Sequence, residues 1–378
     1  MVTMRKQLIL SLLFGVSLLV VSCQKDDSVT EPEKIDNNYL LSNEAITMDL
    51  ISIVNESHSL SSLTTELRNN DPIRLDQVKA LNNNSLESMS KMLNKISDKQ
   101  LLAEKEGVIQ IPELSFVEGS NADKKSKVLY AFPPKGNENE WKYIKAFDSD
   151  GNVYNLDVHQ KPDYSVIIVD VNGKHAFKEV VNRMNKELTS LGIQVERSAV
   201  SKRADGLETT VLESISLKND SEPWIKGAAE IYAISSGIIE RDGQVKPQVR
   251  IIEMPYLDYQ ETTYYPNQVM LFWKDYDYQA ANIQFFEHDS NYNYKELCKI
   301  LFDGLFKIIS AATGEPIVAM VGEMGSAVIE IIPDAVFTDD DDYVDSYYTI
   351  MKNQTYQDRV GANNNATATF KPLFIPNN

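Results

Sequence analysis

The spacing of apolar residues divides the chain into a helical first third and a mainly β remainder. From about 39 to 106, apolar residues recur every three or four positions, as at Leu86, Met89 and Leu93, which predicts two or three amphipathic helices. From about 107 to 171 the period shortens to two, which is typical of strands with one buried face. A helix is predicted over 177–191, where Gly192 is placed to take a left-handed conformation at its C-terminal end.

From 227 to the end, the apolar pattern again indicates strands. We predict them at 228–235, 248–253, 268–273, 281–287, 343–351 and 367–370. Two apolar helices, 295–312 and 317–332, interrupt this series and are joined at Gly314-Glu315-Pro316. Because 317–332 is apolar on nearly all sides, we expect it to be buried, either against the strands or in a membrane or partner.

These patterns predict an α+β multidomain protein. Its parts are a helical region at 39–106, a β-rich α+β domain with one helix at 107–217, and a C-terminal antiparallel β-sandwich at 218–378 that carries the helical hairpin 295–332 as an insertion. A period of 20–50 residues, which would mark a repeat protein, is not evident.

The first residues of the chain form a secretion signal rather than part of a fold. Met4-Arg5-Lys6 precedes an apolar stretch from Leu8 to Val21, and Cys23 follows directly after Ser22, an order that predicts a lipoprotein signal peptide at 1–22. Lipid on Cys23 would anchor the mature chain through a flexible tether at 23–38. Gln24-Lys25-Asp26-Asp27 resembles the surface-export signal of lipoproteins from the Bacteroides and Flavobacterium group. We therefore expect an outer membrane lipoprotein that faces the cell exterior.

The charge of the chain limits its partners. Its formal net charge is -18, and because an acidic surface repels phosphate we expect no nucleic-acid partner. With Cys23 lipidated, Cys298 has no cysteine to pair with, and its apolar neighbours indicate a small buried side chain.

The densest chemistry is a run of four aspartates, Asp339-Asp340-Asp341-Asp342, directly before a strand. Carboxylates on a loop are ligands that calcium prefers, although a solvated acidic loop is the alternative. Two further acidic loops follow strands, and the three loops together resemble a C2-type calcium-binding β-sandwich. The resemblance implies a calcium site formed by Asp258, Glu287, Asp289, Asp339, Asp341 and Asp342. The helical hairpin would then be an insertion within the second calcium loop.

A second resemblance covers the chain from about Val128 onward. The runs Ala228–Tyr232, Met254–Tyr259, Thr262–Gln268 and Asp340–Val344 are similar to a family of secreted bacterial proteins catalogued only as a domain of unknown function. The resemblance implies no activity.

The residues favour a binding or adhesion protein over an enzyme, although they leave enzymatic activity uncertain. We find no zinc-ligand spacing, nucleophile elbow, phosphate loop or dinucleotide fingerprint. Paired carboxylates leave an extracellular hydrolase as one alternative, and a membrane-interacting protein that uses the apolar hairpin is another. In the favoured interpretation, tyrosines beside Asp258 contact a glycan or protein partner. These are Tyr256, Tyr259, Tyr264 and Tyr265.

Overall fold

The computed structural model describes most of the chain beyond the predicted tether. The described residues are 40–82, 86–121, 123–124, 126–135, 140–194, 206–219, 223–227, 229–241, 243–288, 293–311, 321–329 and 343–377. The predicted signal peptide, Cys23 and the tether lie outside them.

The first described part is helical, as the three- and four-residue spacing predicted. Its helices are α1 (Asn43–Ser57), α2 (Leu60–Asn69), α3 (Lys79–Asn82) and α4 (Leu86–Lys105). Ser42 begins α1, because its side chain accepts a hydrogen bond from the backbone N–H of Ala45 at 3.3 Å. His58 ends α1 in a left-handed conformation with φ of 51°.

A mixed six-stranded sheet follows. Its strands are β1 (Ile73–Arg74), β2 (Glu113–Val117), β3 (Val128–Ala131), β4 (Tyr143–Phe147), β5 (Val153–Asp157) and β6 (Ser165–Asp170). They lie in the order β1-β2-β6-β3-β4-β5, with β3 and β6 parallel and the other neighbours antiparallel. The strands β2 to β6 lie in the region 107–171, where the two-residue period predicted strands, whereas β1 lies in the region predicted to be helical.

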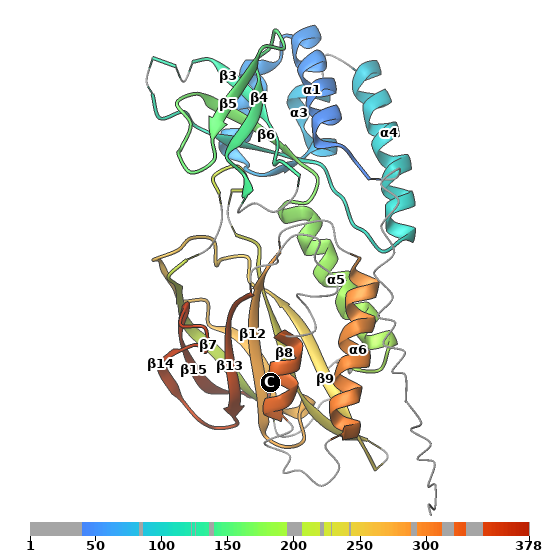
Figure 1. Ribbon diagram of the computed structural model, residues 1–378, viewed down its shortest axis with the longest axis vertical. Helices are drawn as coiled ribbons and strands as arrows, with labels where there is room; N and C mark the ends of the chain where they lie inside the picture. Colours follow the sequence, from blue (N-terminus) through green and yellow to red (C-terminus); the bar gives the residue numbers. More distant parts are fainter. Residues whose placement is uncertain are drawn as a thin grey trace, which may run out of the picture. The chain divides into compact units, whose positions relative to one another are not determined.

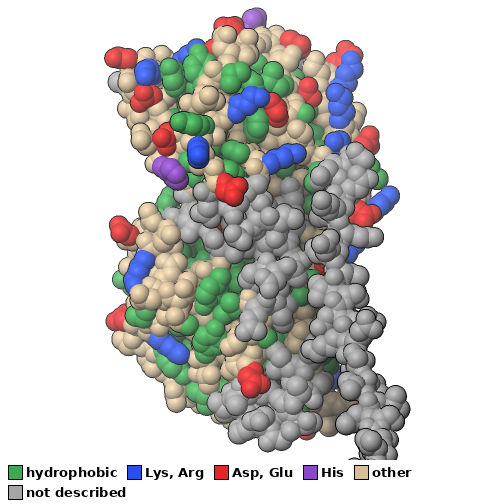
Figure 2. Space-filling view, in the orientation of Figure 1, with side chains coloured by type: hydrophobic (Ala, Val, Ile, Leu, Met, Phe, Trp, Pro, Cys, Tyr) green, Lys and Arg blue, Asp and Glu red, His purple; other side chains and the backbone are tan. Residues whose placement is uncertain are grey.

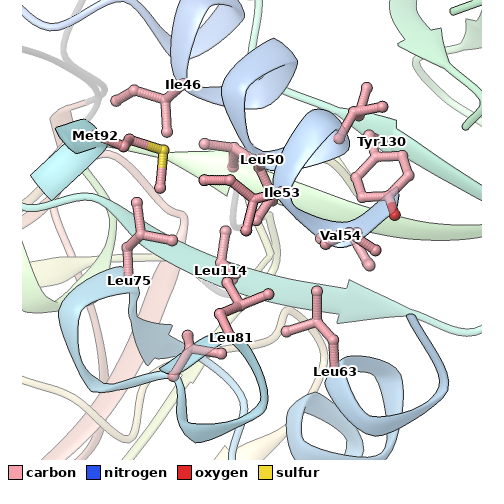
Figure 3. Close-up of a cluster of buried hydrophobic side chains, with 14 of the residues drawn as sticks. Ile46, Leu50, Ile53, Val54, Leu63, Leu75, Leu81, Met92, Leu114 and Tyr130 are labelled. Atoms are coloured by element: carbon pink, nitrogen blue, oxygen red, sulfur yellow. The ribbon is translucent and has the colours of Figure 1, made fainter. Parts of the chain in front are cut away.

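The helices and this sheet share one hydrophobic core. Leu50 and Ile53 of α1, Leu63 of α2 and Met92 of α4 pack with Leu114 of β2 (Figure 3). Since residues on both sides of position 106 are buried in the same core, helices α1–α4 and the six-stranded sheet stabilise one another.

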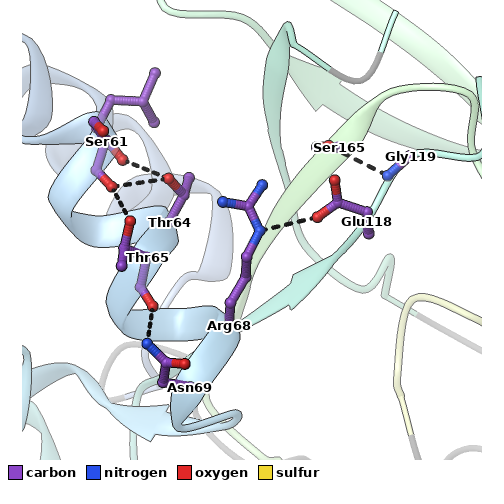
Figure 4. A network of polar contacts seen from close by, with 9 residues as sticks. Ser61, Thr64, Thr65, Arg68, Asn69, Glu118, Gly119 and Ser165 are labelled. Carbon is purple, nitrogen blue, oxygen red and sulfur yellow. Dashed lines mark hydrogen bonds and ion pairs between the residues drawn. The ribbon is translucent and has the colours of Figure 1, made fainter. Parts of the chain in front are cut away.

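Polar contacts add to this packing at the surface. The Nε of Arg68, on α2, donates to Glu118 just after β2 at 3.0 Å, and the same guanidinium lies over the ring of Phe116 (Figure 4). Because Arg68 and Glu118 are both nearly half exposed, the ion pair contributes at most about 1 kcal/mol.

The second half of the chain contains two antiparallel sheets. The first, five-stranded sheet consists of β7 (Leu207–Leu217), β10 (Thr263–Tyr264), β11 (Gln268–Phe272), β14 (Tyr356–Val360) and β15 (Ala366–Ile375). The second, four-stranded sheet consists of β8 (Ile231–Arg241), β9 (Gln244–Glu253), β12 (Ala280–Glu287) and β13 (Tyr343–Met351). The first has the order β10-β7-β15-β14 with β11 also paired to β7, and the second has the order β13-β12-β8-β9. Leu212, Phe285, Tyr347 and Phe370 are buried together between the two sheets, which therefore form a β-sandwich.

Helices cover the other face of the four-stranded sheet. They are α5 (Lys174–Ser190), α6 (Tyr294–Ala311) and a helix at 321–329 (Figure 1). Phe177 of α5, Leu301 of α6 and Met324 of the third helix are buried in one core with Ile234 of β8. Every residue of β12 is therefore buried, because the strand has a layer on each side.

This arrangement bears on the two alternatives for the predicted hairpin 295–332. Its described residues pack on the sheet, and this counts against a hairpin that inserts into a membrane. Within the described part of the chain, moreover, we find no helix with the length and apolar character that crossing a membrane requires.

One edge of the four-stranded sheet is bonded to α5. The side-chain amide of Asn185 accepts a hydrogen bond from the backbone N–H of Ile251 at 3.1 Å and donates one to its carbonyl at 3.0 Å. The N–H of Val249 donates to the carbonyl of Ile193 at 2.8 Å. These contacts occupy backbone groups of the edge strand β9.

Candidate functional site

The structure describes two of the six residues that the C2 resemblance proposes as calcium ligands. Asp258 follows β9 and is half-buried; burial raises the pKa of its carboxyl, and the nearby ammonium of Lys174 opposes that rise. Glu287 ends β12 and is fully buried. Asp289, Asp339, Asp341 and Asp342 lie outside the described residues.

The described residues do not by themselves form a metal site. Among them, no three His, Cys, Asp or Glu side chains lie close enough together to hold an ion. The calcium site stays a prediction, because four of its six ligands lie where the structure gives no placement.

The structure does assign a role to Asp345, an acid three residues after the run of four aspartates and inside β13. Its fully buried carboxylate accepts hydrogen bonds from the backbone N–H groups of Ser346 and Asn363 at 2.7 Å, Asn365 at 2.9 Å and Ala366 at 2.6 Å. A Cβ on Gly361 would lie 2.2 Å from this carboxyl group. Asp345 therefore holds the turn between β14 and β15 around itself, which is a structural role.

The acidic loop at 148–152 is the hairpin turn between β4 and β5. The carboxylate of Asp148 accepts hydrogen bonds from the N–H groups of Asp150 and Asn152 and pairs with the ammonium of Lys127 at 2.9 Å. The Asn152 amide and the Lys127 ammonium hold the pKa of Asp148 well below its usual range. Donors thus surround this carboxylate, where a cation site would need further acceptors.

The four candidate tyrosines do gather on the loop between β9 and β11. The rings of Tyr256 and Tyr264 are 6.3 Å apart, and the backbone N–H of Tyr259 donates to the hydroxyl of Tyr264 at 3.0 Å. Tyr256 and Tyr264 pack against the sandwich core, and the Tyr256 hydroxyl donates to Gln268 at 2.5 Å.

The other two tyrosines point to solvent. Tyr259 is 60% exposed and Tyr265 is 71% exposed. The loop therefore divides into two supporting tyrosines, Tyr256 and Tyr264, and two that are free to contact a partner. We call Tyr259 and Tyr265 the tyrosine pair.

A cluster of titratable groups surrounds the N-terminus of α5, and sequence reasoning did not find it. The carboxylate of Glu113, on β2, accepts hydrogen bonds from the N–H groups of Lys174 and His175 at 3.0 Å, and it contacts His175 Nδ1 at 2.6 Å. A Cβ on Gly173 would lie 2.1 Å from Glu113, so the close approach requires glycine there. These contacts make Glu113 a cap of α5.

Two buried groups near that cap have displaced pKa values. Burial raises the pKa of Asp170, the cross-strand neighbour of Glu113 on β6. Burial, with the Lys226 charge adding to it, lowers the pKa of His288 to about 3. His288 packs its ring 5.0 Å from that of Phe177, and its imidazole is therefore neutral at pH 7.

A family model described as "Protein of unknown function (DUF3103)" matches residues 39–378. The chain belongs to this family. The DUF3103 match begins before α1 and runs through the six-stranded sheet to the end of the sandwich, and it confirms the predicted resemblance to an uncharacterised family. No curated protein and no solved structure matches the chain. The DUF3103 family carries no activity that could be transferred, so function has to be argued from geometry.

Proposed function

We propose that this protein is a lipid-anchored cell-surface protein that binds a glycan through the tyrosine pair. The observation that carries the proposal is that two tyrosines of one loop are held by the sandwich while their two neighbours, Tyr259 and Tyr265, are exposed. The hydrogen bond from the Tyr259 backbone N–H to the Tyr264 hydroxyl holds the loop. Because a tyrosine side chain has few rotatable bonds, the exposed rings lose little conformational entropy on binding.

The chemistry around the tyrosine pair suits an uncharged polar ligand. The loop at 254–268 contains no lysine or arginine and two acids, Asp258 and Glu261, which disfavours anionic partners. Besides the tyrosine pair, Pro255 and Glu261, its exposed side chains are the uncharged polar residues Gln260, Thr262, Thr263 and Asn267. Amides and hydroxyls beside aromatic rings can bond and stack on a neutral sugar. On the face drawn in Figure 2, basic side chains stand among acidic and uncharged ones.

The test replaces both exposed tyrosines by alanine. We expect Tyr259→Ala with Tyr265→Ala to abolish retention on a glycan array while the melting temperature changes little, because neither ring is buried. Tyr143→Ala is the matched control, since Tyr143 on β4 is 64% exposed. A double variant that binds the array as the native protein does would refute the proposal. Loss of binding to a purified protein, with no glycan bound by either form, would assign a protein partner instead.

The anchor at Cys23 is the part of the proposal that rests on sequence alone. The order of basic, apolar and small residues before Cys23 supports it. Cys23→Ser should move the protein from the membrane fraction to the soluble fraction. External protease should remove the native form from intact cells if it faces the exterior.

Calcium is a separate proposal that the acidic run and the C2 resemblance support. Calorimetric titration of calcium into the protein should show saturable binding and a rise in melting temperature. Replacing Asp289 and Asp341 by asparagine should remove both effects. If the native protein shows no binding, the run is a solvated loop.

A further inference from the structure

One face of the four-stranded sheet is apolar under α5 and α6, whereas the helix at 321–329 rests on both the apolar core and polar side chains of the sheet. Residues of β8 and β9 such as Ile234, Val249 and Ile251 contact the first two helices. On the neighbouring strands the same face presents uncharged polar side chains, paired across strands as Ser236 with Asn282 and Gln284 with Ser346. We call these four residues the polar floor.

Gln284, in the polar floor, has no hydrogen-bond partner among the described residues. The side chain is fully buried, and among the described residues neither its amide oxygen nor its amide nitrogen has a hydrogen-bond partner. Asn282, beside it, donates to the carbonyl of Val321 at 2.5 Å and accepts from the N–H of Thr349 at 3.0 Å. Burying an amide without a partner costs free energy, and opening the site would recover it because water could then hydrogen-bond the amide.

The helix above the floor is poorly suited to staying in place. Gly322 and Gly325 are two of its nine described residues, and glycine disfavours a helix because it loses the most backbone freedom on ordering. Gly325 lies directly on the sheet. A Cβ there would be 2.8 Å from the ring of Tyr348 and 2.9 Å from the amide nitrogen of Gln284.

We propose that the helix at 321–329 is a removable cover, which leaves the sheet while α6 and the sandwich stay folded. Opening exposes the polar floor with the Tyr348 ring at its edge. The floor's amides and hydroxyls both donate and accept hydrogen bonds and carry no charge, so the surface it offers fits an uncharged polar ligand. This proposal for the helix at 321–329 does not depend on the proposed binding role of the tyrosine pair.

Thiol labelling can compare the two halves of the face in one molecule. In a full-length chain with Cys23→Ser, Cys298 is the only thiol; it is fully buried between α6 and α5, where its Sγ donates to the Met184 carbonyl at 3.6 Å. Ser346→Cys adds a second thiol under the cover, and the change is close to isosteric. With N-ethylmaleimide under native conditions, we expect Cys at 346 to react at least about 100-fold faster than Cys298. Equal rates would mean that the cover opens only on global unfolding, and would overturn the proposal.

Two glycine substitutions supply a matched pair on the cover itself. A Cβ on Gly322 would meet nothing within 4 Å, whereas one on Gly325 would press on Tyr348 and Gln284. Alanine raises the intrinsic helix propensity equally at both positions. Gly322→Ala should therefore slow labelling at position 346 by about fivefold. Gly325→Ala should speed labelling, because its Cβ would push the helix away from the sheet. Slowing by both, or no effect of either, would show that the helix does not close the floor in the manner proposed.

Discussion

Helix α6 and the helix at 321–329 cover the same sheet but rest on different chemistry. Leu297, Leu301 and Leu305 of α6 are completely buried in an apolar core. The second helix buries Val321, Met324 and Val328 in that core, yet its glycine contact at Gly325 lies over amides. The difference teaches that two helices with similar apolar patterns can have unequal attachment, because the partner surface decides how much burial stabilises them.

The largest effect should come from removing a side chain under α6. Leu301→Ala leaves a cavity in the shared core, and we expect the free energy of unfolding to fall by about 2–5 kcal/mol. Urea denaturation followed by circular dichroism measures it. A loss below about 1 kcal/mol would show that α6 is as loosely held as the second helix.

The next largest effect should come from acid, which lowers the free energy of unfolding through His288, packed against Phe177 of α5. His288 has a pKa of about 3 in the folded protein and about 6.5 when unfolded, so the unfolded state takes up the proton first and stability is lost as the pH falls below about 6.5. The expected slope approaches 1.4 kcal/mol for each pH unit.

The pH dependence can be assigned by comparing two histidine variants. His288→Gln should flatten the change between pH 6 and pH 4, whatever its effect at pH 7. His159→Gln, at an exposed position, should leave the slope unchanged. If both variants kept the native slope, other groups would be responsible.

Shortening a buried side chain of the helix at 321–329 should lower the free energy of unfolding less. Met324→Ala removes a fully buried side chain, but a helix that opens separately from the rest transmits little of that loss to global unfolding. We expect about 1 kcal/mol in the same urea experiment, and a loss equal to that of Leu301→Ala would remove the distinction between the two helices.

The smallest change should be a gain. Gln284→Met replaces a buried amide, for which the described residues supply no partner, by an apolar side chain of similar size. The free energy of unfolding should rise by about 1 kcal/mol. Asn282→Met is the contrasting variant, because Asn282 uses its amide fully and its loss should destabilise. A destabilised Gln284→Met protein would indicate that the amide has a partner after all.

The sequence predicted what depends on local spacing. The strand at 343–351 has the bounds of β13, and the predicted helices at 295–312 and 177–191 fall on α6 and α5. It missed β1 and β10, whose two residues are too few to show a period. It also missed β14, because the polar centre Gln357-Asp358-Arg359 shows no alternation of apolar and polar residues. It also could not show that α1–α4 share a core with the six-stranded sheet, because periodicity gives a buried face without its partner.

The candidate site was harder to predict for the same physical reason. Asp345 looks in sequence like the aspartates of the nearby run, yet backbone N–H groups enclose its carboxylate. No local sequence pattern indicates this, because three of the donors lie at the turn between β14 and β15. The tyrosines were found because aromatic residues concentrated on one loop are visible without a fold. Which of them face solvent depends on the contact between Tyr256 and Tyr264, which only the folded chain creates.

The bond between Asn185 and Ile251 has a consequence beyond the single molecule. An unpaired strand edge can add the strand of a neighbouring copy, and the risk grows wherever copies are crowded, as they would be on a membrane. The Asn185 amide bonds the N–H and C=O of Ile251 as a neighbouring strand would, so these two backbone groups of the β9 edge are not available to another strand.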